Sequence, residues 1–200
     1  MAGYSILLPP PWHRIHLGAS RGRDVRRATD RAAARAPKEI PPDQRAKIRR
    51  RLEAQLMHQL DAVEQCGGVD FYYPAHEVDG VELHASFVVS AVLPDARTEA
   101  DTVGGVLAAL LGRGGEPVSV DDTVWVRTET VVDRDDDASG ALRARQVDYL
   151  TAVPGDERRW VLVTCTVVGD GDPDSLPSGL VVELFDAIMS TWRWQRDVAA

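Results

Sequence analysis

The chain has 200 residues, of which 44% are hydrophobic and 27% charged, and a formal net charge of −8. This composition is typical of one folded domain and excludes a disordered chain. The longest apolar run, Val103 to Leu111, is far shorter than the ~18 residues of a membrane helix. Residues 1–17 lack the basic and apolar regions of a secretory signal. Because Cys66 and Cys165 have no paired spacing, we expect reduced thiols in a soluble, cytoplasmic protein.

Positive and negative charges are separated along the sequence. Residues 1–60 contain 13 Lys and Arg against 5 Asp and Glu, a net charge of +8. Residues 61–200 contain 10 against 26, a net charge of −16. Such a chain attracts partners of either sign, or folds its basic part against its acidic part. Nearly all the basic residues are Arg, which together with abundant Ala, Val and Asp is typical of a high-GC, for example actinobacterial, genome.

The N-terminal residues predict a turn followed by a short strand. Three prolines at residues 9–11 fix φ and cannot donate to a sheet, so they form a turn or an edge. Residues 12–17 then alternate with the period of a half-buried strand. This period places His13 and His16 on opposite faces, which argues against a shared metal ion.

Two helices are expected in the basic part of the chain. Residues 20–36 are mostly Arg, Ala and Asp, with Val25 as the one larger apolar side chain, so we expect an exposed, marginal helix. Residues 43–66 predict a stronger helix that ends at Gly67. Its apolar stripe consists of Ile48, Leu52, Leu56, Leu60 and Val63.

Strand patterns dominate the remainder of the chain. Residues 69–73 and 81–93 are β-branched and aromatic, and a connection of hairpin length joins them. Further strands are expected at residues 118–132, 141–153 and 160–168, again with separators of hairpin length. Consecutive strands joined in this way predict an antiparallel sheet.

Two more apolar helices are expected among these strands. One begins at Thr98, with Asp101 at the spacing of a capping box, and ends at Gly112. The other follows Ser178, which we predict to be its N-cap, and continues to Trp192. Since apolar-striped helices need a sheet face to cover, these elements predict an α+β fold.

Several local patterns accompany this order of elements. A Pro-Trp turn and strand occupy residues 11–15, a strand pair occupies residues 148–166, and an apolar helix surrounds residues 184–188. The combination resembles the PsbP/Mog-like α/β/α sandwich. The resemblance implies an antiparallel sheet of about six strands with helices on both faces, in a single domain of residues 1–200. Residues 20–42 would form an exposed Arg-, Ala- and Pro-rich segment. Since members of that family bind other proteins and are not known for catalysis, it also implies a non-enzymatic adaptor or accessory factor.

No motif of a catalytic or cofactor-binding centre stands out. The nearest approach to a nucleophile elbow, around Ser178, lacks the first glycine. The glycines of residues 112–115 follow a helix rather than a strand, which is the wrong order for a phosphate-binding loop. We therefore expect no catalytic residue, cofactor or metal ion. The alternative is ligand binding or hydrolysis in a pocket between sheet and helices, with Glu129 and Asp148 as acid and base.

Two acidic loops leave calcium binding open. Residues 170–174 carry Asp at the spacing of the first three EF-hand ligands, but Ser175 and Val181 stand where Gly and Glu are needed. Calcium binding would therefore require residues 169–179 to meet the acidic loop of residues 133–140.

The Arg-rich segment is the clearest sign of a binding surface. Arginines and exposed aromatics dominate the hot spots of protein interfaces. The expected partner-binding residues are therefore Trp12, Arg26, Arg27, Arg31, Tyr72 and Tyr73. Another protein is the favoured partner, because residues 18–70 contain no aromatic side chain on which nucleic acid bases could stack. Electrostatic nucleic-acid binding through the Arg-rich N-terminal third is the second alternative.

Overall fold

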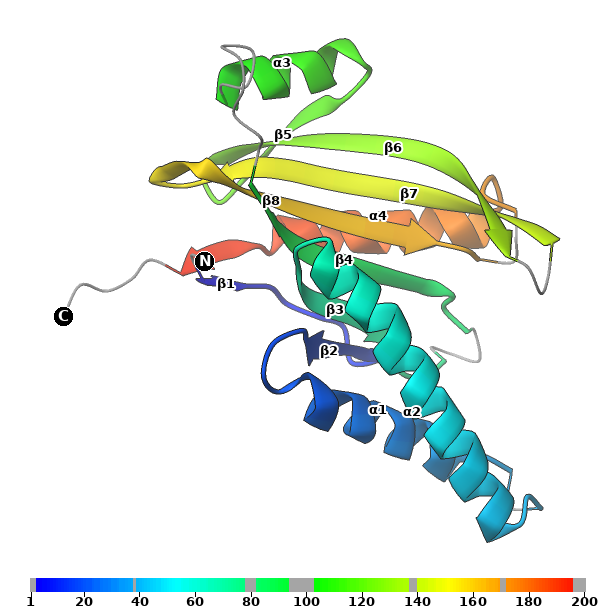
Figure 1. Ribbon diagram of the computed structural model, residues 1–200. Coiled ribbons are helices and arrows are strands. Elements are labelled where there is room, and N and C mark those ends of the chain that lie inside the picture. The colour runs from blue at the N-terminus through cyan, green and yellow to red at the C-terminus, as the bar shows by residue number, and fades with distance from the viewer. Residues whose placement is uncertain are drawn as a thin grey trace.

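The computed structural model describes residues 3–37, 39–77, 82–93, 103–136, 140–169 and 172–195. Most strands belong to one antiparallel sheet, made of β2 (Trp12–His16), β3 (Gly68–Pro74), β4 (Ala85–Val92), β5 (Glu116–Val120), β6 (Thr123–Asp136), β7 (Gly140–Val153) and β8 (Asp156–Val167). The order of these seven strands is β2-β3-β4-β8-β7-β6-β5 (Figure 1). Two short strands, β1 (Gly3–Ser5) and β9 (Arg193–Gln195), pair separately.

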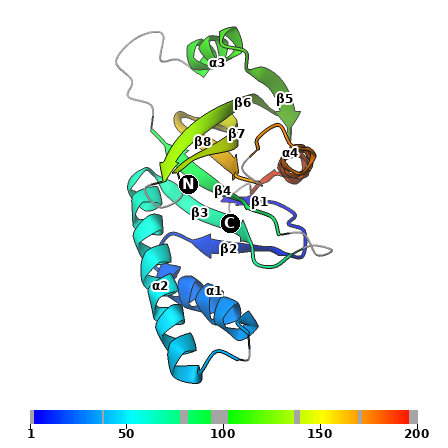
Figure 2. The same cartoon turned by 90° about the vertical axis from the view of Figure 1, so that its right-hand side faces the viewer.

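The described residues form four helices, α1 (Arg21–Arg35), α2 (Pro42–Gln65), α3 (Val103–Gly112) and α4 (Leu176–Ser190). Helix α4 lies along one face of the sheet, behind the long strands in Figure 1, whereas α1 and α2 lie on the opposite side at β2 and β3 (Figures 1 and 2). The predicted α+β class and antiparallel sheet are therefore confirmed. No helix in the described ranges has the length and apolarity to cross a membrane.

The larger hydrophobic core lies between the sheet and α4. Strand alternation brings the fully buried side chains of Phe87, Trp125 and Val163 to this face, where they meet Phe185 of α4. Trp192, directly after α4, is also fully buried in this core. The predicted apolar stripe of the last helix is therefore confirmed as the face that covers the sheet.

A second, smaller core lies under α1 and α2. Ile15 of β2 and Leu60 of α2 are each 1% exposed, and Val25 of α1 is completely buried between them. Ala28 and Thr29 of α1 are buried as well, because their small size lets α1 approach its neighbours closely. The prediction that residues 20–36 form an exposed, marginal helix is therefore wrong for this face of α1.

Two element boundaries differ from the sequence predictions, and a third lies outside the described residues. The strand predicted at 118–132 is a hairpin of β5 and β6, because Asp121 and Asp122 both have positive φ (50° and 57°), as in a tight hairpin turn. Ser175, rather than Ser178, caps α4, and its side chain accepts a hydrogen bond from the Ser178 backbone. The predicted start of a helix at Thr98 lies outside the described residues, which show α3 from Val103 onward.

Candidate binding surface

The predicted aromatic binding residues lie on different sides of the sheet. Trp12 and Tyr72 are only 4% and 2% exposed, so the prediction that they are exposed is wrong. Both side chains lie on the α4 face, where the Tyr72 ring stacks on Phe87 with centroids 4.4 Å apart. Tyr73, the next residue, lies on the opposite face and is half-buried. The alternation of a strand therefore divides this aromatic pair between a core and a surface.

The predicted arginines of α1 are exposed. Arg26 lies 3.4 Å from Glu53 and Arg27 lies 3.9 Å from Asp24, yet their side chains remain 70% and 64% exposed. Arg31 lies toward His13 of β2, and burial together with the positive charge of Arg31 lowers the pKa of His13. These arginines form a basic surface on the α1 side of the pair of helices α1 and α2.

The apolar stripe of α2 is covered at only one end. The 24 residues of α2 make a helix about 36 Å long, whose N-terminal half extends beyond the sheet (Figure 1). Leu60 is buried and Leu56 is half-buried, but Leu52 and Ile48 are 40% and 43% exposed. The apolar stripe that was predicted to be buried is therefore buried at Leu60 but exposed to solvent at Leu52 and Ile48.

An open pocket of about 290 Å³ lies where the stripe reaches the sheet. Most of its lining is apolar and comes from Leu56, Phe71, Tyr73, Pro74, Leu83 and Ala85. Leu56 belongs both to the pocket and to the stripe, and Leu52 and Ile48 follow it on successive turns of α2 outside the pocket. We use the name α2 groove for the pocket lining together with the exposed side chains of Ile48 and Leu52.

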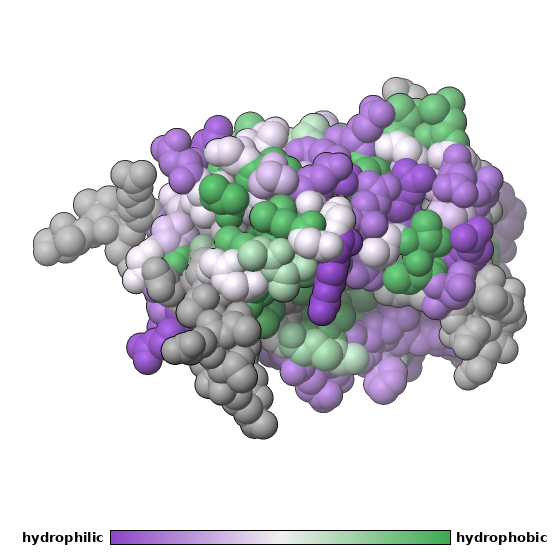
Figure 3. All heavy atoms as spheres, turned by 90° about the horizontal axis from the view of Figure 1, so that it is seen from above, coloured by the Kyte–Doolittle hydropathy of each residue, from purple (hydrophilic) through white to green (hydrophobic). Residues whose placement is uncertain are grey.

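Other exposed apolar side chains do not adjoin this pocket. Leu111 of α3 and Val124 of β6 are 38% and 55% exposed, and Leu180 of α4 is 53% exposed. On the side seen from above, hydrophobic patches are divided from one another by hydrophilic residues (Figure 3). Scattered apolar side chains of this kind are ordinary on folded proteins, whereas a stripe that leads into a pocket is not.

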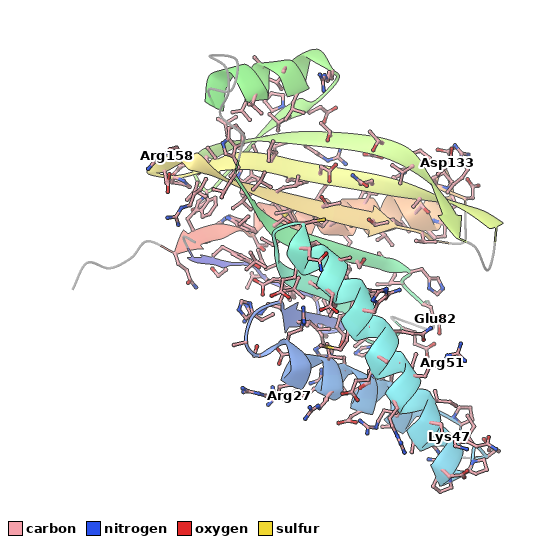
Figure 4. The ribbon with its side chains drawn as sticks, viewed as in Figure 1. Arg27, Lys47, Arg51, Glu82, Asp133 and Arg158 are labelled. Atoms are coloured by element: carbon pink, nitrogen blue, oxygen red, sulfur yellow. The ribbon has the colours of Figure 1, made fainter. Side chains whose placement is uncertain are left out.

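Basic side chains flank the α2 groove on its solvent side. Lys47 and Arg51 are one helical turn apart and project from the same side of α2, away from Arg27 of α1 (Figure 4). Within the described ranges, no carboxylate forms an ion pair with Lys47, Arg50 or Arg51. Arg49, by contrast, contacts both Asp30 and Glu53. In the part of the chain that the structure describes, the positive charge of Lys47 and Arg51 is therefore not neutralised by carboxylates of α1 or α2.

A buried polar cluster surrounds Asp70 on the α4 face of β3. The Asp70 side chain, 4% exposed, accepts a hydrogen bond from the Tyr4 hydroxyl at 2.5 Å, and its other oxygen lies 3.0 Å from His16 Nδ1. The Tyr4 and Tyr72 hydroxyls are 2.8 Å apart. Burial, with the nearby charge of Asp70, raises the pKa of Tyr4. The cluster attaches β1 to the sheet, and sequence reasoning missed it because Tyr4 and Asp70 are 66 residues apart.

Replacing Asp70 with Asn is expected to lower the free energy of unfolding by about 1–3 kcal/mol, because a buried charged acceptor loses charge-assisted hydrogen bonds. Urea unfolding measures the change. Asp133→Asn is the matched control, since Asp133 is 77% exposed in its pair with Arg143 and should cost less than about 0.5 kcal/mol. Equal losses in the two variants would contradict a structural role for the cluster.

A second polar network joins α4 to the sheet. The Arg127 guanidinium of β6 donates to both carboxylate oxygens of Asp186, at 3.0 and 3.1 Å, and to Glu129 at 2.8 Å. The Tyr149 hydroxyl also donates to Asp186, at 2.8 Å. Burial alone would lower the pKa of Arg127, but the hydrogen bonds to Asp186 and Glu129 raise it. The network therefore joins α4 to β6 and β7 through side-chain hydrogen bonds of Asp186.

The predicted acid–base pair does not form. In the register of β6 and β7, Glu129 lies opposite Val147, whereas Asp148 lies opposite Thr128. Because neighbouring residues of a strand face opposite ways, Glu129 and Asp148 lie on opposite faces of the sheet. Glu129 and Asp148 therefore do not act together as acid and base in one pocket, whereas ligand binding or hydrolysis in a pocket between sheet and helices stays a prediction.

The acidic loops are described only in part. Asp133 lies 3.4 Å from Arg143, and Asp174 lies 3.5 Å from Arg145. Residues 137–139 and 170–171, which the calcium alternative also needs, lie outside the described residues. Elsewhere in the chain as described, no three His, Cys, Asp or Glu side chains are grouped so that they could hold a metal ion. The two cysteines are free, with Cys66 exposed and Cys165 buried.

No protein-family model, curated protein or solved structure matches this chain.

Proposed function

We propose that the protein is a non-enzymatic adaptor that binds another protein through the α2 groove. The observation that supports this proposal is the stripe of α2, which leaves Leu52 and Ile48 40% and 43% exposed and leads into an open pocket. Burying an aliphatic side chain contributes about 1.5–3 kcal/mol, so a partner that covers both side chains gains substantial affinity. A helix with an exposed apolar row beside a pocket is a common arrangement for recognising a partner segment.

We also propose a PsbP/Mog-like fold and a cytoplasmic location for the protein. An α/β/α sandwich of the PsbP/Mog-like type is supported by α4 on one face of the sheet and by α1 and α2 on the opposite side (Figure 2). A cytoplasmic location is supported by the exposed thiol of Cys66, which is free. Neither assignment is needed for binding through the α2 groove.

A paired substitution tests the proposed surface. In Ile48→Glu/Leu52→Glu, two carboxylates would have to be buried when a partner covers the groove, so we expect at least a tenfold loss of affinity. The measurement is a selection of displayed random peptides on the immobilised protein. The affinity of each selected peptide is then determined by fluorescence anisotropy.

The matched control carries the same two acidic side chains at exposed apolar positions away from α2. Val124→Glu/Leu180→Glu changes side chains of β6 and α4 that are 55% and 53% exposed and should leave peptide affinity unchanged. Far-ultraviolet circular dichroism checks that both variants are folded. Selected peptides that bind the Ile48→Glu/Leu52→Glu variant as tightly as the unchanged protein would reject the α2 groove as the binding surface.

A further inference from the structure

We infer that the α2 groove recognises an acidic amphipathic helix that inserts one bulky apolar side chain into the pocket. This inference rests on the proposed function and adds the chemical class of the partner. Three properties of the groove carry it: the strands around the pocket, the size of the pocket, and the charge beside it.

The strands around the pocket are interior strands of the sheet. Tyr73 and Pro74 of β3 pair with β2, and Ala85 and Ser86 of β4 pair with β8, whereas the pairing of β3 with β4 ends at Tyr72 and Phe87. The pocket therefore offers an added strand only a short gap between two strands and no open edge of the sheet. A helix satisfies its own backbone groups, so it can lie on an apolar surface with side-chain contacts alone.

The dimensions fit a helix with one anchor side chain. A pocket of about 290 Å³ lies at the lower limit of small-molecule sites, which typically measure about 300–1,000 Å³. Ile48 and Leu56 are about 12 Å apart along α2, or about two helical turns. A partner helix with apolar residues on successive turns would therefore cover Ile48 and Leu52 while its anchor occupies the pocket.

The charge beside the groove fits acidic residues on the flank of that helix. Lys47 and Arg51 lie along the solvent side of the stripe, and within the described part of the chain neither has an intramolecular ion pair. Glu82, which lies 3.6 Å from His84, is on the same side of α2 as Arg51 in Figure 4. An acidic residue one turn from the apolar row, toward the N-terminal end of α2, would therefore face Lys47 or Arg51.

The test is a second peptide selection on the charge-reversal variant Lys47→Glu/Arg51→Glu. Peptides selected on the unchanged protein should combine apolar residues at helical spacing with Asp or Glu on one flank. The variant should bind those peptides about threefold to tenfold less tightly and should itself select Lys or Arg on that flank. Arg113→Glu/Arg158→Glu is the matched control, since it reverses two exposed charges after α3 and near the start of β8, far from α2, and should leave the selected pattern unchanged.

The outcomes separate the inference from the proposed function. Peptides that need Ile48 and Leu52 but carry no acidic flank would overturn the inference and leave protein binding through the groove intact. Peptides that do not depend on Ile48 and Leu52 would overturn both. Selective binding of a short DNA duplex that is lost in Lys47→Glu/Arg51→Glu would assign the basic row to nucleic acid and overturn the inference. Concentration-dependent dimers abolished by Ile48→Glu/Leu52→Glu would make a second copy of the chain the occupant and also overturn it.

Discussion

Replacing Trp192 with Ala is expected to lower the free energy of unfolding by about 3–5 kcal/mol. Trp192 is completely buried. Its ring stacks on Tyr4 with centroids 4.2 Å apart and meets Trp125 edge to face at 5.2 Å. The substitution therefore leaves a large cavity in the main core and also removes the surface on which Tyr4, and with it β1, packs.

Urea unfolding followed by circular dichroism measures this loss. Leu176→Ala is the matched control, because Leu176 is 76% exposed and its removal should change the free energy of unfolding by less than about 0.5 kcal/mol. A loss below about 1 kcal/mol in Trp192→Ala would contradict the packing at the end of α4. A loss of β1 pairing should appear as faster hydrogen exchange of the amides in residues 3–5.

Stability is expected to fall steeply as the pH rises above about 10. Burial is the main reason why the pKa values of Tyr4, Tyr72 and Tyr149 are raised in the folded protein. Below about pH 10 these tyrosines are protonated in both states, so their contribution to stability is fully present. Above about pH 10 the unfolded chain loses protons that the folded protein retains, so the unfolded state is favoured. Each such tyrosine removes up to about 1.4 kcal/mol per pH unit.

Urea unfolding at closely spaced values between about pH 8 and pH 11 measures this dependence. The buried thiol of Cys165, whose pKa is raised by burial, adds to the loss at the lower end of that range. Tyr149→Phe should reduce the slope above about pH 10, because Phe has no proton to lose. A free energy of unfolding that stays constant up to about pH 11 would show that these hydroxyls are exposed to solvent.

The pair of helices α1 and α2 connects the fold of this protein to its proposed function. The core under α1 and α2 is small, with Ile15, Leu17, Val25 and Leu60 as its fully buried aliphatic side chains. The N-terminal half of α2 lies beyond this core, so its stripe is free for a partner. Binding at Ile48 and Leu52 should therefore stabilise the hairpin as well as the complex. Hydrogen exchange in α2 with and without a selected peptide tests this link.

Much of the fold could be predicted because local patterns determine it. The stripe from Ile48 to Val63 has helical spacing, and the structure places α2 at Pro42–Gln65, within one residue of the predicted bounds. The strand pair of β3 and β4 was likewise predicted from β-branched and aromatic runs. By contrast, β1 and β9 have three residues each and pair across almost the whole chain, so no local period marks them.

The candidate site depended much more on tertiary structure. Alternation predicts that Tyr72 and Tyr73 face opposite ways, but the sequence does not show which of the two faces α4 covers. Glu129 and Asp148 were assigned to neighbouring strands, and only the register shows that they lie on opposite faces. The exposed stripe of α2 was visible as a pattern, yet its apolar character alone predicts burial.

The sequence by itself determined most of the helices and longer strands and the class of the fold, because helical and strand periods are local properties of the chain. It also determined that positive charge is concentrated in residues 1–60. Only the tertiary structure decided which faces are covered, since burial depends on where distant elements pack. That packing buries Trp12 and Tyr72 against α4, pairs Asp70 with Tyr4, and leaves Ile48 and Leu52 on the surface because α2 is longer than the sheet face it covers.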